Sequence, residues 1–179
     1  NAPQTTAFGA IFVIALSLPF AWLWPKLDKL GINPSYPAKF AWGLVFCGLA
    51  FGILSWAAGN PGDTGLVSLW WMILAYFVLV LGEMVLSPIG LAAVTSLSIK
   101  RAVGLMMGAW FLFSAFGEII AGRMGTWASI EPNADGSFDV ARSLQVYSSV
   151  FTDMMWIGLA AGVLMFVLTP LLKKLMRPA

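Results

Sequence analysis

Long runs of apolar residues, separated by short clusters of charged, glycine and proline residues, extend through the whole chain. Each run is close to the roughly 20 residues that an α-helix needs to cross about 30 Å of hydrocarbon. The runs are continuous and do not alternate with polar residues, which indicates helices and argues against the strands of a membrane β-barrel. The pattern predicts five transmembrane helices, over about residues 5–24, 40–58, 66–98, 102–122 and 147–172.

Composition supports an all-α integral membrane protein. Of the 179 residues, 60% are hydrophobic and 10% are charged, whereas a soluble domain has about 25% charged residues. The chain has no histidine and one cysteine, Cys47, so we expect no internal disulfide, no metal site and no histidine-based catalysis. An intramembrane enzyme is therefore disfavoured. The net charge of +2 is too small to indicate nucleic-acid binding.

The distribution of basic residues predicts the orientation in the membrane. Eight of the ten lie in segment 25–39, in the link at residues 100–101 or in the C-terminal tail, all on one side of the predicted spans. The other side has Arg123 and Arg142, together with several acids. Because basic residues concentrate in cytoplasmic segments, we expect a multi-pass protein of the cytoplasmic membrane whose C-terminus is cytoplasmic.

Two further features concern the ends and the packing of the spans. The first residue is Asn1 and residues 1–24 carry no positive charge, so we expect no signal peptide and a piece of a longer chain. A turn-rich segment at 131–136 predicts a solvated loop. Pairs of small residues four apart let helices approach closely in lipid, and three such pairs occur: Gly48 with Gly52, Gly104 with Gly108, and Gly158 with Gly162.

Glu83 lies in the middle of the third span, where an ionised group is costly unless it has a partner or faces a wet cavity. Ser87 lies on the same helix face, and Leu91 continues that face. Pro88 predicts a kink, with Gly90 beside it, and the freed carbonyls are tolerated mainly where they are buried or line a cavity. The segment is a candidate substrate or ion site. A protonated carboxyl that is hydrogen-bonded between helices is the alternative.

The fourth span carries a second polar face. Trp110, Ser114 and Glu118 recur every four residues and can share one side of a helix. At 1.5 Å per residue, Glu118 lies at the level of Glu83, about 25 Å from the basic end of the spans. The same arithmetic places Trp110 at the level of Leu91, about 13 Å from that end.

Simpler roles for these side chains stay open. Trp110 is also compatible with lipid exposure or core packing. Glu118 can pair locally with Arg123 near the outer surface. Asp153, close to the start of the fifth span, fits an interfacial or helix-start residue.

Several short motifs resemble the proton-dependent oligopeptide transporter family of the major facilitator superfamily. They are FAWLW at 20–24, GE at 82–83, LSPIGL at 86–91 and VGLMMGAWFL at 103–112. The resemblance covers nearly the whole chain, which is similar to the last five helices of a twelve-helix core. It implies five transmembrane helices of the C-terminal bundle.

The resemblance implies proton-coupled symport of di- and tripeptides by alternating access, with protons as the coupling ion and no other cofactor. The implied partners are the peptide, the lipid bilayer and the N-terminal helix bundle of the same transporter. Glu83 would attract the peptide amino terminus in the central cavity. The candidate substrate-binding set is Glu83, Ser87, Trp110, Ser114 and Glu118. Leu91 and Met107 would form a cytoplasmic gate, and Pro88 and Gly90 a helix kink.

The chain also departs from the family pattern. Gly9-Ala10 stands where the family commonly has Asn-Pro, and Glu118 stands where it commonly has asparagine. The Glu-x-x-Glu-Arg signature of the family's first helix is absent from these residues. The alternatives are another major facilitator carrier, for nitrate, sugar or drugs, and a non-transport membrane assembly subunit.

Overall fold

The computed structural model describes residues 2–62, 66–130 and 139–176. These residues form five antiparallel helices: α1 (Ala2–Lys29), α2 (Tyr36–Gly59), α3 (Leu69–Leu97), α4 (Val103–Trp127) and α5 (Val140–Leu175). All five are long and apolar enough to span a membrane, which confirms the all-α membrane fold. The predicted loop at 131–136 lies outside the described residues.

The helices extend beyond several of the predicted spans. α1 continues through Pro25 and ends at Lys29. A proline removes only one backbone hydrogen bond, and basic residues in the last turn interact favourably with the helix dipole. α5 begins at Val140, where the carboxylate of Asp139 accepts a hydrogen bond from the backbone N–H of Arg142 at 3.1 Å. Apolar length marks the hydrocarbon crossing, whereas capping and backbone hydrogen bonds determine where a helix ends.

The tightest packing joins α2 to α5, with α3 on another side of α2. A Cβ atom added to Gly158 on α5 would lie 2.8 Å from the Cα of Gly48 on α2, and one added to Gly162 would lie 3.2 Å from the carbonyl oxygen of Ala41. Two of the three predicted glycine pairs therefore form this helix contact. In the third pair, Gly104 and Gly108 meet no neighbour within 4 Å among the described residues.

Polar side chains reinforce the same interface. The hydroxyl oxygens of Ser55 on α2 and Thr152 on α5 lie 2.6 Å apart. Ser55 also donates to the carbonyl of Ser148, and Ser148 donates back to the carbonyl of Ser55. Hydrogen bonds of this kind hold helices together in lipid, where the hydrophobic effect does not.

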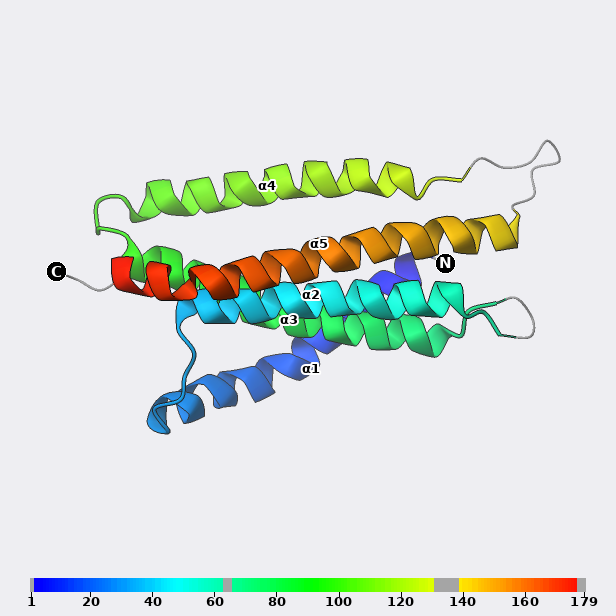
Figure 1. Ribbon diagram of the computed structural model, residues 1–179. Coiled ribbons are helices and arrows are strands. Elements are labelled where there is room, and N and C mark those ends of the chain that lie inside the picture. The colour runs from blue at the N-terminus through cyan, green and yellow to red at the C-terminus, as the bar shows by residue number, and fades with distance from the viewer. Residues whose placement is uncertain (1, 63–65, 131–138, 177–179) are drawn as a thin grey trace.

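The remaining helices lie at the periphery. α1 packs on α3, and α4 also contacts α3, but α4 lies apart from α2 and α5 along most of its length (Figure 1). The C-terminal ends of α1, α3 and α5 lie at the same end of the structure, so successive helices alternate in direction as expected (Figure 1).

Candidate functional site

Glu83 and Ser87 lie on an exposed side of α3, beside the helix face that packs on α2. Gly82, one residue earlier, is buried, and a Cβ atom there would lie 2.9 Å from the carbonyl oxygen of Gly43 on α2. A step of one residue turns the chain by about 100° around a helix, so Glu83 leaves this contact. Glu83 and Ser87 are both exposed among the described residues. The carboxylate and the hydroxyl are therefore available to a ligand or to another part of the protein.

Trp110 of α4 packs directly on the backbone of α3 at Gly90. A Cβ atom added to Gly90 would overlap the outer edge of the Trp110 ring and would lie 3.0 Å from Cζ of Phe40 on α2. The Phe40 and Trp110 rings meet edge-on, with their centroids 6.2 Å apart. Trp110 is half-buried as a result. We call Phe40, Gly90 and Trp110 the aromatic cluster.

The aromatic cluster lies on the same side of α3 as Glu83. Gly90 follows Glu83 by seven residues, close to two helical turns, or about 10 Å along the axis. α4 runs antiparallel to α3, and Glu118 follows Trp110 by eight residues, about 12 Å. The contact between Trp110 and Gly90 thus puts Glu118 near the level of Glu83, in agreement with the depth arithmetic.

The other candidate residues fall into two groups. Leu91 and Met107 are half-buried, and in the sequence they lie next to Gly90 and three residues before Trp110, respectively. Ser114 and Glu118, on α4, are exposed. The hydroxyl of Ser114 donates to the carbonyl oxygen of Trp110 at 3.0 Å, so its donor is already used within the helix. Its oxygen can still accept a hydrogen bond from a ligand.

The proposed kink residues have different surroundings. Pro88 is exposed and α3 continues as one helix on both sides of it, while Gly90 is buried. The absence of a side chain at Gly90 is what admits the Trp110 ring. Gly90 thus allows the Trp110 ring to pack closely on the backbone of α3.

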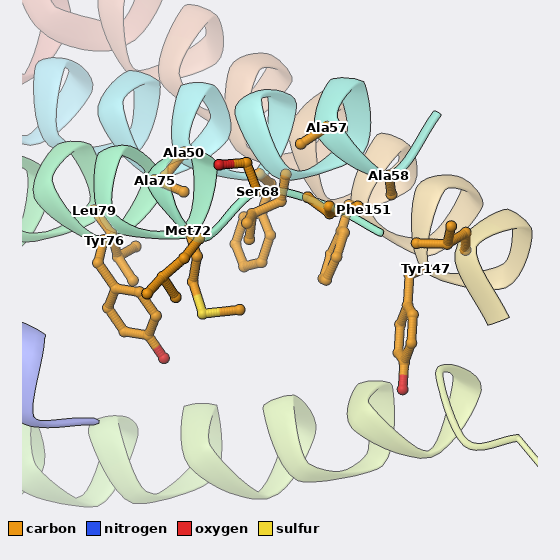
Figure 2. Close-up of a pocket in the computed structure, with 15 residues that line it drawn as sticks. Ala50, Ala57, Ala58, Ser68, Met72, Ala75, Tyr76, Leu79, Tyr147 and Phe151 are labelled. Atoms are coloured by element: carbon orange, nitrogen blue, oxygen red, sulfur yellow. The ribbon is translucent and has the colours of Figure 1, made fainter. Parts of the chain in front are cut away.

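A separate apolar cavity lies elsewhere. It has a volume of about 560 Å³ near the ends of α2, α3 and α5 opposite the aromatic cluster, and it is lined mainly by apolar side chains, among them Phe51, Met72 and Phe151. Tyr76 and Tyr147 project across it toward α4 (Figure 2). Among the described residues, those that line it are uncharged.

Two features of this end of the helices were not found from the sequence. Phe40 carried no pattern that distinguishes it from other apolar residues. Lys39 was expected in a loop covering residues 25–39, but it lies inside α2 and is buried, with 6% of its surface exposed. That expectation was wrong. Pro37, in the first turn of α2, was the available signal, because proline is favoured at helix starts.

Residues 1–140 match the POT family. Dipeptide and tripeptide permease B of Aliivibrio fischeri is 36% identical over 179 residues, which cover 98% of this chain and 35% of the relative. Dipeptide and tripeptide permease A of Yersinia pestis is 35% identical over 148 residues, which cover 83% of this chain and 29% of the relative. The chain thus spans about a third of the length of the curated relatives it matches.

Solved structures give the same picture. A crystal structure of peptide transporter POT in complex with sulfate has a TM-score of 0.77 and 31% identity, and the match covers 96% of this chain and 31% of that one. A structure described as giving insights into substrate recognition in proton dependent oligopeptide transporters has a TM-score of 0.72 and 27% identity, over 96% of this chain and 33% of that one. The helices are therefore arranged as in part of a major facilitator fold.

Proposed function

The chain belongs to the POT family, and from that premise we propose that the full-length protein is a carrier, not an enzyme, for di- and tripeptides. It takes them up across the cytoplasmic membrane together with protons. The two relatives named above are described as dipeptide and tripeptide permeases. Because this chain spans about a third of their length, the substrate and the coupling are proposed for the whole protein.

One observation carries the proposal: the carboxylate of Glu83 and the ring of Trp110 lie on the same side of α3. Glu83 is exposed on that side, and the Trp110 ring lies on Gly90 two turns further along. An ionised carboxylate in the middle of a span costs free energy unless it has a partner or faces a wet cavity. We assign this side of α3 to the central cavity between the two helix bundles.

In the proposed mechanism, ionised Glu83 attracts the ammonium group of the peptide. The attraction between opposite charges is several-fold stronger in a low-dielectric cavity than in bulk water. Ser87 and Ser114 supply hydroxyl groups along the same cavity, and Glu118 adds a second carboxylate at about the same level. Protonation of Glu83 removes its charge and weakens its hold on the ammonium, which links peptide release to a proton.

Alternating access follows from relative motion of the two bundles about this midplane site. We propose that Trp110 walls the cavity and that Leu91 and Met107 close it toward the cytoplasm. The partners are the peptide, the bilayer and the N-terminal helix bundle, which belongs to the part of the relatives that this chain does not span. Protons are the coupling ion, and the C-terminus is placed in the cytoplasm.

Proton-driven uptake by the full-length protein in proteoliposomes tests the proposal. We expect labelled dialanine to accumulate when an inward proton gradient is imposed, and a protonophore to abolish the accumulation. Nitrate and glucose, offered under the same gradient, serve as controls for other carriers of the superfamily. Accumulation of either control without dialanine would assign a different substrate, and accumulation of none would favour an assembly subunit.

A further inference from the structure

A second cavity, of about 420 Å³, lies at the end of the structure where most basic residues gather. It is an open cavity lined by the end of α1, the link between α1 and α2, the start of α2 and the C-terminal ends of α3 and α5. Its polar lining includes Asp28, Asn33, Tyr36, Lys39 and Lys173. The volume falls in the range of small-molecule sites. None of the proposed transport residues lines this cavity, so it is separate from the peptide site.

Among the residues that line this cavity, Lys39 has the burial that helix packing explains least. It is 94% buried, the only buried charged side chain among the described residues. Its ammonium lies 4.0 Å from the centre of the Trp24 ring, and Asp28 attracts it from nearby. A cation–π contact offsets only part of the desolvation of a largely buried lysine. An anion in the cavity would supply an oxygen acceptor for its N–H donors.

The surrounding groups include several hydrogen-bond donors. Lys173, in the last turn of α5, brings a second ammonium to the cavity. One oxygen of the Asp28 carboxylate accepts a hydrogen bond from the side-chain amide of Asn33 at 2.6 Å. That bond orients Asn33, whose amide oxygen is buried without a hydrogen-bond partner among the described residues.

We propose that this cavity binds the phosphate of an anionic lipid headgroup in the leaflet on the basic side of the membrane. Two lysines and one aspartate leave a single net positive charge, which matches the single negative charge of a phosphodiester. Basic cavities between transmembrane helices are a recognised setting for anionic headgroups. The ammonium of Lys26 lies 4.2 Å from the centre of the Trp22 ring, and tryptophan is enriched at the membrane interface, where such headgroups are found.

Adjacent lysines allow a matched test in the full-length protein. Lys173 and Lys174 are both exposed in the last turn of α5, but only Lys173 lines the cavity. Native mass spectrometry from detergent would measure how much dioleoyl phosphatidylglycerol each variant retains. We expect Lys173→Gln to bind it about tenfold more weakly, the cost of one charge-assisted hydrogen bond, and Lys174→Gln to bind like the parent. Lys39→Met should lose binding more fully.

Additional arms separate the possible ligands. Dioleoyl phosphatidylcholine, which has no net charge, should be retained less than phosphatidylglycerol. If inorganic phosphate displaces phosphatidylglycerol and itself depends on Lys173, the site takes free phosphate rather than a lipid. Equal losses in Lys173→Gln and Lys174→Gln, or equal retention of the two lipids by the parent, would overturn the proposal even if Lys39→Met fails to fold.

Discussion

At the scale of single residues, Gly90 decides how closely α4 can approach α3. Any larger side chain there meets the Trp110 ring, with Phe40 directly behind it. The atoms that would be displaced are at the tip of the indole and not in the backbone. The ring can therefore move. Its movement would separate Trp110 from Gly90 and Phe40, about two helical turns from Glu83 on the same side of α3.

Gly90→Ala tests this contact in the full-length protein. We expect a loss of about 1–3 kcal/mol in the free energy of unfolding, as for overpacked sites, measured from thermal or denaturant unfolding in detergent. In a Trp110→Ala background the same change should cost little, since the overlapping atoms are gone. The double-mutant cycle should then give a coupling of about 1 kcal/mol or more.

Gly108→Ala is a control for the general effect of replacing glycine in a helix, because its Cβ atom meets no neighbour within 4 Å among the described residues. It should be neutral or slightly stabilising. A penalty for Gly90→Ala that is the same with and without the Trp110 ring would show that the ring is not what crowds Gly90.

Sequence reasoning reached some of these residues and not others. Glu83 could be found because a charge in an apolar run is rare and costly. Trp110 could be placed in depth because helix rise is constant. Phe40 could not be found, since an apolar residue in an apolar span gives no sign of which helix it faces. The burial of Lys39 was also missed, because a lysine beside a basic loop is ordinarily at the surface.

At the scale of helices, the α2–α5 pair is the best-packed part of the chain. Gly48 and Gly158 bring the two backbones together, and the hydroxyl groups of Ser55 and Thr152 bond across the same interface. Close approach and interhelical hydrogen bonds are the main sources of helix association in lipid. This pair should therefore form a firm unit, against which the more weakly attached α4 can shift.

Gly158→Leu should separate this pair. Its side chain would meet backbone atoms of Gly48 at less than 3 Å, and backbone cannot yield as a rotamer can. We expect a loss of about 3 kcal/mol or more in unfolding free energy, at the upper end for overpacking. Ala160→Leu, on an exposed part of the same helix, is the matched control. Equal stabilities of the two variants in a thermal unfolding assay would contradict this view of the interface.

The number and type of the helices were predictable because each crossing needs a continuous apolar run. The residues at which the helices begin and end were less predictable. α1 passes through Pro25, and α5 starts before the apolar run does, since backbone hydrogen bonding continues into the interface. The glycine pairs indicated close contacts, but the partner of each pair depends on tertiary packing. Thus Gly48 meets Gly158, while Gly104 meets nothing described.

At the scale of the whole molecule, the residues of the proposed site in this chain would form one wall of it. The carboxylates, hydroxyls and Trp110 that we assign to the peptide lie on α3 and α4, and Glu83, Ser87, Ser114 and Glu118 are exposed. The relatives are about three times as long. A site between two bundles can be predicted only in part from five helices, because the proposed opposite wall lies in residues outside this chain. The prediction that these helices do allow is the carboxylate proposed to meet the peptide amino terminus.

The central claim is that Glu83 holds the peptide ammonium, and a competition assay on the full-length protein tests it most directly. Dialanine and N-acetyl-dialanine differ in that charge and would be compared on the parent, Glu83→Gln and Glu118→Gln. Loss of a desolvated charge pair costs about 2–5 kcal/mol, so the parent should prefer dialanine by at least about tenfold. We expect Glu83→Gln to lose this preference and Glu118→Gln to retain it. An undiminished preference in Glu83→Gln would contradict the claim.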